Sequence, residues 1–467
     1  MPQTLVISTP DAVSTTTKTF PKQGVYNLKI TRNGEFDTVE LWFRSAAANI
    51  TLELAGASFL STAQVSAPRI APTAPTSISG STLALTPNAT HYMKIKLNNG
   101  ISVAHLRCSY TAKSTNSTVC GGNIRGQAFV DYSKKPYIST SLEKMFTTYP
   151  VKTDLTKWDI SSVTSLNDMF LNNITFNQPI GNWNVSNVTN MAGMFYGATS
   201  FNQDLSSWNV SNVTAMFYMF NGAAAFNQPI GSWNVSKVTS MDNMFYGAAA
   251  FNQDLSSWNV SNVTNMGSMF NGATAFNQPI SNWNVSKVTS MSYMFRMATS
   301  FNQDLSSWNV SNVTNMSGMF QDAAAFNQPI GNWNVSKVTN MNGMFWWSTK
   351  FNQPIGNWNV SNVTNMYLMF YGAAAFNQDL SSWAAKFNVN VILAGFFSLA
   401  GLDTTNYDKF LNALWTDINT TRPQAWALRT EPKVLGMGTS KYSAASVAAR
   451  NSLVSNGWTI TDGGLSA

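Results

Sequence analysis

Apolar residues recur along the middle of the chain at a fixed spacing of 25 residues. Phe occupies every 25th position from Phe176 to Phe376, and Trp does the same from Trp158 to Trp383, with no insertion between them. A period of roughly 20 to 50 residues is typical of repeat proteins, in which each unit stacks on the next. The sequence therefore predicts an array of about ten coils over residues 154–383.

Each unit presents the same apolar positions, which in the unit from Phe176 to Ser200 are Phe176, Ile180, Trp183, Val185, Val188, Met191, Met194 and Phe195. Burying side chains of this size contributes about 2 kcal/mol each. Ordering the unit costs roughly 1 to 2 kcal/mol per residue, so a single unit cannot fold alone. Because stacking covers both faces of each coil, we expect these positions to form a continuous core.

Local propensity within the unit alternates between β-prone and turn-forming stretches. Residues 183–185 and 188–191 favour short strands, whereas residues 191–198 are small or unbranched and end near Gly197. We expect two short strands and one helical turn per coil, and hence a mainly β fold with short helical turns. Parallel strands would place neighbouring coils about 4.8 Å apart. The recurring asparagines are expected to hydrogen-bond the turns: Asn177, Asn184, Asn187 and Asn190.

Residues 1–110 predict a small β-sandwich that serves as an attachment domain. The pairs Asn33-Gly34 and Asn99-Gly100 predict two hairpins, of 25–30 with 38–43 and of 91–97 with 101–106. Further strands at 5–8, 50–54 and 82–85 bring the expected total to about seven. The Ser-, Thr-, Ala- and Pro-rich stretch 61–79 predicts an exposed loop, and residues 111–153 a polar connector to the first coil.

Beyond Trp383 the repeat degenerates, which predicts an α/β cap over residues 384–467. The Phe396-Phe397 pair stands two residues later than the Met-Phe pairs of the regular units. A capping signal at 405–408 predicts a helix with one apolar face made by Phe410, Leu411, Leu414 and Trp415. A second helix at 444–453 and a strand at 458–461 would complete a cap that shields the last coil.

From Leu155 to Trp383 the chain follows the pattern F-N-Q-[DP]-[IL]-x-x-W-N-V-S-x-V-T-x-M-x-x-M-F and resembles the BspA-type surface-protein repeats. The tail from Tyr442 to Gly464 is similar to the segment that commonly closes such arrays. The resemblance implies a leucine-rich-repeat-like, right-handed solenoid used for adhesion or display, with no catalytic residues to carry over. Family members usually carry a signal peptide, and residues 1–20 lack the apolar core of one.

The formal charge of +7 does not predict nucleic-acid binding. Residues 1–150 hold 14 basic and 7 acidic residues (14 − 7 = +7), whereas residues 176–383 hold 5 and 6 (5 − 6 = −1), without a basic run in either region. Lys237, Lys287 and Lys337 recur every 50 residues and are interpreted as a solvated face. We also expect no membrane span, because the longest apolar run, residues 391–402, is too short.

Catalytic and metal-binding patterns are absent from the sequence. His91 and His105 have no metal-ligand spacing with Cys108 or Cys120, so neither a metal nor another cofactor is expected. The two cysteines enclose a polar loop and would close one disulfide in an oxidising environment, with two free thiols as the alternative. One acidic residue recurs along the array, at Asp204, Asp254, Asp304 and Asp379, which does not make a paired-carboxylate site. We expect no enzyme.

Two slots in each unit vary while the rest is fixed: the pair after the first Met and the pair after Met-Phe. Because the fixed positions are committed to the core, a partner would be selected at these slots. Aromatic and Arg side chains are common interface anchors, and the candidate binding residues are Phe217, Tyr218, Tyr293, Arg296, Trp346, Trp347, Tyr367 and Tyr371. The alternative is that they only cover the edge of the array.

These patterns predict a non-enzymatic protein of a virion surface, such as a capsid or tail fibre, or of a cell surface. Its N-terminal domain would anchor it, and the array would bind a host surface glycan or protein. Two alternatives stay open: a purely structural minor capsid or cement protein that contacts neighbouring capsid or tail proteins, and an exported bacterial adhesin. A homo-oligomer formed through the N-terminal domain is a further option.

Overall fold

The computed structural model describes the backbone of eleven strands between residues 4 and 125, then residues 142, 144, 146, 155, 156 and 160–466. The chain separates into two units. The first comprises residues 1–145 with 157–163, and the second comprises residues 146–156 with 164–467. Each unit is described by itself.

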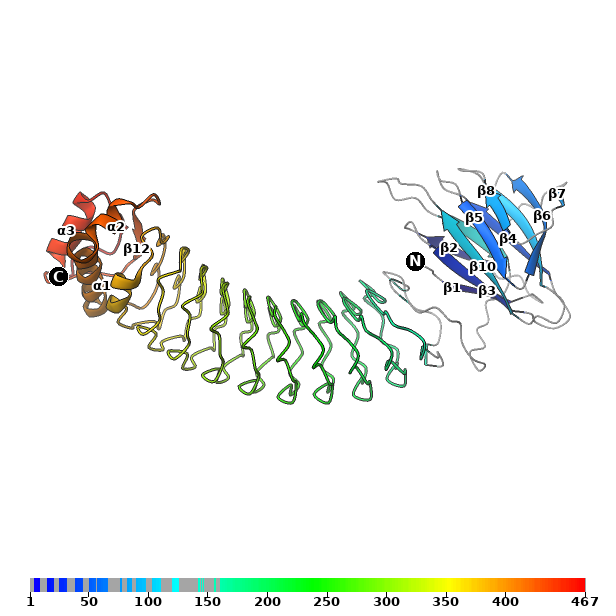
Figure 1. Ribbon diagram of the computed structural model, residues 1–467, viewed down its shortest axis with the longest axis horizontal. Helices are drawn as coiled ribbons and strands as arrows, with labels where there is room; N and C mark the ends of the chain where they lie inside the picture. The colour runs from blue at the N-terminus through cyan, green and yellow to red at the C-terminus, as the bar shows by residue number, and fades with distance from the viewer. Residues whose placement is uncertain are drawn as a thin grey trace. The chain divides into compact units, whose positions relative to one another are not determined.

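The N-terminal unit consists of two sheets, drawn in blue to cyan in Figure 1. The first sheet has the order β1-β3-β10-β5-β8, and the second the order β2-β11-β4-β9-β6-β7. The strands are β1 (Thr4–Ser8), β2 (Thr15–Phe20), β3 (Val25–Thr31), β4 (Thr38–Arg44), β5 (Ile50–Ala55), β6 (Ala57–Val65), β7 (Thr76–Ser77), β8 (Thr82–Leu85), β9 (Thr90–Leu97), β10 (Val103–Tyr110) and β11 (Cys120–Arg125).

Both predicted hairpins are wrong. β3 pairs with β1 and β10, while β4 pairs with β9 and β11, so the Asn33-Gly34 connection joins strands of different sheets. The same holds at Asn99-Gly100, because β9 belongs to the second sheet and β10 to the first. An Asn-Gly pair favours a reversal of the chain, but the reversal can equally carry the chain from one sheet across to the other.

The β-rich region is also larger than the sequence predicts. β6 and β7 occupy parts of the stretch 61–79 that we expected to be a loop, and they pair with each other. β11 pairs with β2 and β4, so the second sheet extends past Tyr110 into the expected connector. Cys108 lies in β10 and Cys120 in β11, but their side chains, like those of His91 and His105, lie outside the described residues. The disulfide therefore stays a prediction.

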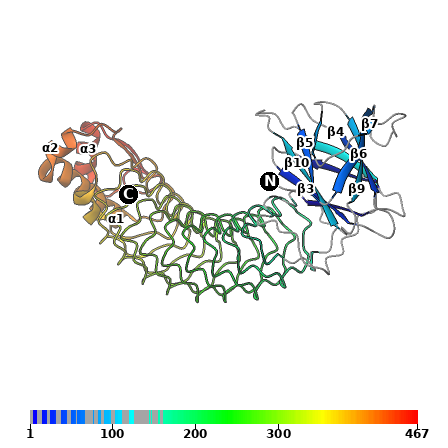
Figure 2. The same ribbon diagram turned by 45° about the vertical axis from the view of Figure 1, so that its right-hand side comes forward.

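In the second unit the backbone follows the same path every 25 residues, and both views show the coils stacked side by side (Figures 1 and 2). A parallel bridge links each coil to the next at one residue, beginning with Ser165 to Asn190 and continuing to Asn365 with Ile392. No strand forms at residues 183–185, and the second expected strand is reduced to this single bridge. Each coil is otherwise made of turns.

The segment 191–197 joins the coils by an alternating backbone ladder. The N–H groups of Met191, Gly193, Phe195 and Gly197 donate to carbonyl oxygens of the next coil at 2.6 to 2.9 Å. Between these residues, the N–H of Met194 donates within its own coil, to the carbonyl of Met191 at 3.2 Å. Gly193 and Gly197 have φ of 60° and 67°, so left-handed residues interrupt what would be a helix. The predicted helical turn is therefore wrong, because its N–H groups point along the array.

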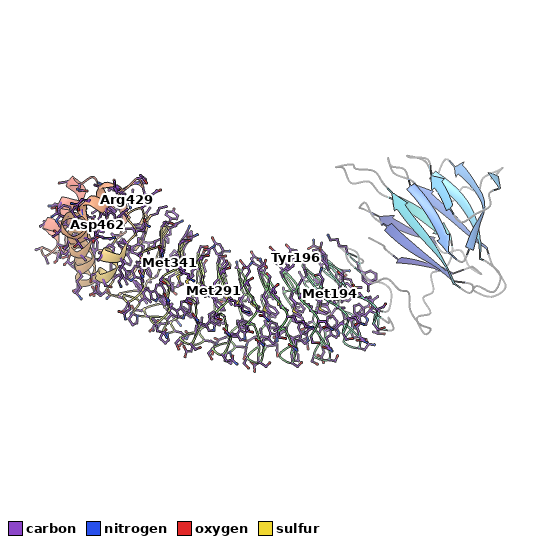
Figure 3. The ribbon with its side chains drawn as sticks, viewed as in Figure 1. Met194, Tyr196, Met291, Met341, Arg429 and Asp462 are labelled. Carbon is purple, nitrogen blue, oxygen red and sulfur yellow. The ribbon has the colours of Figure 1, made fainter. Side chains whose placement is uncertain are left out.

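The eight recurring apolar positions are buried throughout the array, as the sequence predicts. Phe195 lies 3.9 Å from Phe201 and 5.5 Å from Phe220 between ring centroids, in stacked geometry. From Trp183 to Trp383, each Trp of the 25-residue column donates its indole N–H to a carbonyl of the preceding coil, as Trp258 does to Ile230 at 3.0 Å. Figure 3 labels Met194, Met291 and Met341 within the stacked coils. The core is thus continuous from coil to coil.

Asparagine side chains satisfy the backbone at the turns, in two different ways. Asn277 Oδ1 accepts from the N–H of Asn302 and from Gln303 Nε2, both at 2.9 Å, so this column bridges neighbouring coils. The Asn184 and Asn190 columns instead act within their own coil, where Asn184 Oδ1 accepts from the N–H of Ser186 at 3.1 Å. The structural role predicted for these asparagines is confirmed at these three columns and at the fourth, that of Asn187, where Asn212 Nδ2 donates to Ser186 O at 2.8 Å.

The repeat continues past Trp383 with a two-residue shift. After η1 (Ser381–Lys386), carbonyl groups of the segment 391–398 still accept hydrogen bonds from N–H groups of the preceding coil. The N–H of Phe370 donates to the carbonyl of Phe396, whereas the register of the regular units would place the acceptor two positions earlier. The later elements are α1 (Thr404–Thr416), η2 (Asp417–Thr421), α2 (Pro423–Ala427), β12 (Val434–Gly436), α3 (Val447–Ser455) and β13 (Thr459–Thr461). β12 provides the acceptor for the last coil, because Gly436 O accepts a hydrogen bond from the N–H of Phe397 at 2.8 Å.

The predicted helix of the cap is confirmed as α1, but its N-cap is Asp403 rather than a residue of the predicted signal at 405–408. Phe410, Leu411 and Leu414 of the predicted apolar face are buried, and Trp415 is half-buried. The second helix begins later than predicted, as α3 at Val447. No helix among the described residues is long and apolar enough to cross a membrane.

Two carboxylates of the cap pair with arginines, whereas the buried Asp408 accepts hydrogen bonds from Ser443 and Ser446. Arg422 contacts both carboxylate oxygens of Asp417 and donates to Phe387 O at 3.0 Å. Arg450 pairs with Asp462 at 2.8 Å, and Tyr407 donates to the same carboxylate at 2.8 Å. Burial, followed by the Asp462 charge, raises the pKa of Tyr407 far above its usual range, so the hydroxyl stays protonated.

Candidate functional site

The two variable slots of every coil lie along one edge of the array, here called the variable edge. In the first full coil it comprises Ala192, Gly193, Tyr196 and Gly197, and in each later coil the residues 25 positions further on. Figure 3 labels Tyr196 at this edge. The ladder segment 191–197 contains these residues, so the backbone that joins the coils also carries the variable side chains.

Several large apolar side chains of the variable edge are exposed to solvent. The exposed fractions are 36% for Phe217 and for Tyr218, 38% for Tyr293, 44% for Trp347 and 43% for Tyr367. The other three candidates, Arg296, Trp346 and Tyr371, are half-buried. Five of the eight candidate residues are therefore exposed on the variable edge and three are half-buried, and their role in binding stays a prediction.

Two residues of the variable edge in every coil have a left-handed backbone. The first column runs Gly193, Tyr218, Asn243, Ser268, Tyr293, Gly318, Gly343 and Leu368, and the second runs Gly197, Gly222, Gly247, Gly272, Met297, Asp322, Trp347 and Gly372. Glycine adopts this conformation freely, whereas a side chain there costs roughly 1 to 2 kcal/mol. Tyr218, Tyr293 and Trp347 therefore occupy positions that other coils give to glycine.

A glycine in the following coil makes room for several of these side chains. An added Cβ on Gly372 would lie 2.7 Å from ring carbons of Trp347. Gly318 has the same relation to the Tyr293 ring, and Gly395 to the side chain of Leu368. Because a methyl group at these glycines would collide with the preceding side chain, the residue choices in neighbouring coils are coupled.

Ring contacts divide the edge into two aromatic clusters. Tyr218 contacts Phe217 and Tyr196, with centroid distances of 5.9 and 6.2 Å. Tyr371 contacts Trp346 at 5.9 Å and Trp347 at 6.0 Å, both edge-on. We call the group Tyr196, Phe217 and Tyr218 the first cluster and the group Trp346, Trp347 and Tyr371 the second cluster. Tyr367 lies in the same coil as Tyr371. Tyr293 and Arg296 lie in the coils between and join neither.

Sequence reasoning missed three residues of this edge. Tyr196 belongs to the first cluster, while Tyr246 and Met297 are exposed by 38% and 42%. All three occupy the variable slots, so the column position would have identified them. Singling out individual aromatic pairs, rather than whole columns, left them out.

Polar side chains also occupy the variable edge, among them Asn243, Ser268 and Asp322 in the left-handed columns. Asp322 precedes Trp347 in the second left-handed column, and the Asp322 N–H donates to Trp346 O at 2.7 Å. Trp346 Nε1 is buried without a hydrogen-bond partner within the described part of the chain. Across the residues whose side chains are described, no three His, Cys, Asp or Glu gather closely enough to hold a metal ion. The arrangement is suited to contact through aromatic faces and amide or hydroxyl groups.

Comparison with known proteins identifies the repeat family. The family described as "Mycoplasma protein of unknown function, DUF285" matches residues 140–256, 226–316 and 305–402, which together span more than half of the 467 residues. The chain belongs to this family. The match supports the resemblance to BspA-like repeats at the level of the family. No curated protein and no solved structure matches the chain.

The extent of the DUF285 match agrees with the geometry of the coils. It continues past Trp383 to residue 402, and the backbone ladder also continues to Ser398, which accepts from the N–H of Gly372 at 2.9 Å. The DUF285 description assigns no activity, so function has to be argued from the variable edge.

Proposed function

We propose that this protein is a non-enzymatic binding protein of a virion or cell surface. In this proposal a leucine-rich-repeat-like, right-handed solenoid built on the 25-residue motif displays the variable edge to a partner, and the N-terminal β-domain attaches the protein to its particle or cell. The partner is a surface glycan or protein that stacks on the two aromatic clusters.

The observation that supports this proposal is the choice of residues at the left-handed positions. Tyr218, Tyr293 and Trp347 have φ of 59°, 56° and 54° and remain 36 to 44% exposed. Glycine at the same column in other coils shows that the fold needs no side chain there. A strained conformation that keeps an aromatic ring partly in water does not serve stability, and such strain is common at functional sites.

The contrast between the fixed and the variable positions of each coil also supports the proposal. The apolar positions that hold the core are the same in every unit and fully buried, while the variable slots hold almost all exposed aromatic side chains of the array. Tyr and Trp offer a large contact area with few rotatable bonds, which makes them frequent anchors in binding surfaces. A glycan ring or a protein loop would find such platforms at two places on the edge.

The test compares the full-length protein with a variant carrying Tyr218→Gly, Tyr293→Gly and Trp347→Gly. Glycine is the native residue at these columns in sibling coils, so we expect the variant to fold as the wild type does while losing its aromatic faces. Binding would be measured on a glycan array and on whole cells. Loss of binding with a melting temperature no lower than that of the wild type supports the proposal.

The matched control is Leu399→Gly. Leu399 also has a left-handed backbone, with φ of 59°, and is exposed by 44%, but it lies outside both aromatic clusters. This control should bind like the wild type. If the wild type binds nothing, or if the triple variant binds as well as the wild type, the variable edge is not the recognition surface, and a structural role as a minor capsid or cement protein becomes the better account.

A further inference from the structure

Two stripes of charge run along the array outside the variable edge. The Lys stripe consists of Lys237, Lys287 and Lys337, and the Asp stripe of Asp204, Asp254 and Asp304. All six residues are exposed. Residues 176–383 hold 5 basic and 6 acidic residues, so these six make up more than half of the eleven charges of the repeats (5 + 6 = 11). Charge is therefore concentrated in the two stripes.

Hydrogen bonds hold the charged groups in place. Each Lys Nζ donates to the Oδ1 of the Asn that occupies the same position one coil earlier, at 2.7 Å in all three cases. Each Asp accepts at Oδ1 from the N–H of the Ser two residues later, at 2.8 Å. The Ser206 and Ser256 hydrogen bonds lower the pKa of Asp204 and Asp254, which keeps both ionised.

None of the six charges forms an ion pair within the described part of the chain. The ion pairs found there lie in or against the cap: Lys409 with Asp379, Arg422 with Asp417 and Arg450 with Asp462. Asp379 occupies the same column 75 residues after Asp304, off the 50-residue period, and Lys409 of α1 pairs with it at 3.1 Å. It is therefore not counted in the Asp stripe.

The two stripes have the same period. Both recur every 50 residues, or every second coil, which corresponds to about 10 Å along the array for parallel backbone spacing. A row of cations can stay in register with a row of anions over several charges only when the spacings agree. Each copy of this chain carries both rows at equal spacing, so each row has its complement on a second copy.

We propose that two copies of the chain associate side by side along their arrays, with the Lys stripe of one against the Asp stripe of the other. The contact is weak for each pair, because an exposed ion pair contributes about 0.2 to 1 kcal/mol. Several pairs that form together in register add up, and copies crowded on one particle or cell meet at high effective concentration. This association is independent of partner binding at the variable edge.

Salt dependence and charge reversal test the proposal on the full-length protein. Sedimentation velocity at ~20 mM and ~500 mM salt should show self-association that is lost at the higher salt, where the screening length falls well below 10 Å. The variant Lys237→Glu, Lys287→Glu, Lys337→Glu and the variant Asp204→Lys, Asp254→Lys, Asp304→Lys should each be monomeric alone. When mixed, the two variants should associate at least as strongly as the wild type.

Each outcome decides the question. A wild-type protein that stays monomeric at low salt and high concentration overturns the proposal. Self-association that persists in both reversal variants also overturns it, because the contact then lies elsewhere, for instance in the N-terminal domain. The triple glycine variant of the aromatic residues should self-associate normally, so failure of the binding proposal and failure of this one are distinguishable.

Discussion

The indole of Trp347 lies over the bare backbone of Gly372, its successor one coil later in the same column. A Cβ on Gly372 would stand 2.7 Å from the ring carbons, and both residues have a left-handed backbone, with φ of 54° and 68°. Only glycine meets both conditions at residue 372, because a side chain there would be strained as well as crowded. The effects of substitutions at Trp347 and Gly372 on stability should therefore be coupled.

A double-mutant cycle should reveal this coupling. We expect Gly372→Ala to destabilise the protein by about 2 to 3 kcal/mol, from left-handed strain and collision with the ring. In the Trp347→Gly background the same substitution should cost only the strain, about 1 to 2 kcal/mol. Urea unfolding of the four proteins measures the difference. Equal costs in the two backgrounds would show that the ring does not press on residue 372.

The asparagine column that bridges neighbouring coils should contribute more to stability than the column whose side chains bond only within their own turn. Replacing Asn277 by Ala removes the acceptor of the Asn302 N–H and of Gln303 Nε2, which are part-buried. The Asn302 N–H is left without a partner, which costs about 1 to 3 kcal/mol, whereas Gln303 Nε2 keeps its hydrogen bond to the Asn277 carbonyl at 3.0 Å. Asn284→Ala is the control, since Asn284 Oδ1 serves only the exposed N–H of Ser286. Chemical denaturation should give a lower free energy of unfolding for Asn277→Ala than for Asn284→Ala.

Removal of one whole coil should preserve the fold. Deletion of residues 251–275 would join two coils that both carry Gln-Pro-Ile, and the native chain already has this junction between the coils that start at Phe326 and Phe351. The ladder and the Phe and Trp columns would stay in register, because each coil contacts only its neighbours. Circular dichroism and melting curves should resemble those of the wild type. Deletion of residues 251–262 is the control and should give an unfolded or aggregated product.

Acid should loosen the cap through Asp403. Hydrogen bonds from Asn377, and then from the N–H of Asn406, lower the pKa of this carboxyl below its ordinary 3.8. A carboxyl with a lowered folded-state pKa contributes stability above the unfolded-state pKa and loses it as the pH falls through the folded-state value. We expect melting temperature to drop below about pH 4. In Asp403→Asn, which still caps α1 but does not titrate, the drop should be smaller.

The core of the array could be predicted from the sequence because its signal is redundant. Every unit repeats Phe, Trp, Val and Met at the same offsets, so a position such as Val188 is supported by all its counterparts, and each is buried. The variable edge was predicted by the complementary argument, from the positions that the core leaves free. Both inferences rest on comparing units, which needs no knowledge of the backbone.

The backbone of the ladder could not be predicted in the same way. Residues 191–198 have the composition of a helical turn, and only Gly193 and Gly197 hint at left-handed φ. In other coils Tyr218 or Trp347 occupies these columns, which hides the signal, because bulky residues rarely adopt this conformation. The hairpins failed for a different reason: an Asn-Gly pair specifies a local reversal, while strand pairing is decided by distant strands such as β10 and β11.

The ladder also determines how the array would respond to force. Successive coils are linked by three or four equivalent backbone hydrogen bonds along the segment that begins at Met191 and its successors. The interfaces between coils are therefore nearly identical and lie one after another along the array. A pull on the two ends would peel coils away one at a time, and each event would release 25 residues, or about 85 Å of extended chain. The array would therefore lengthen in equal steps under load.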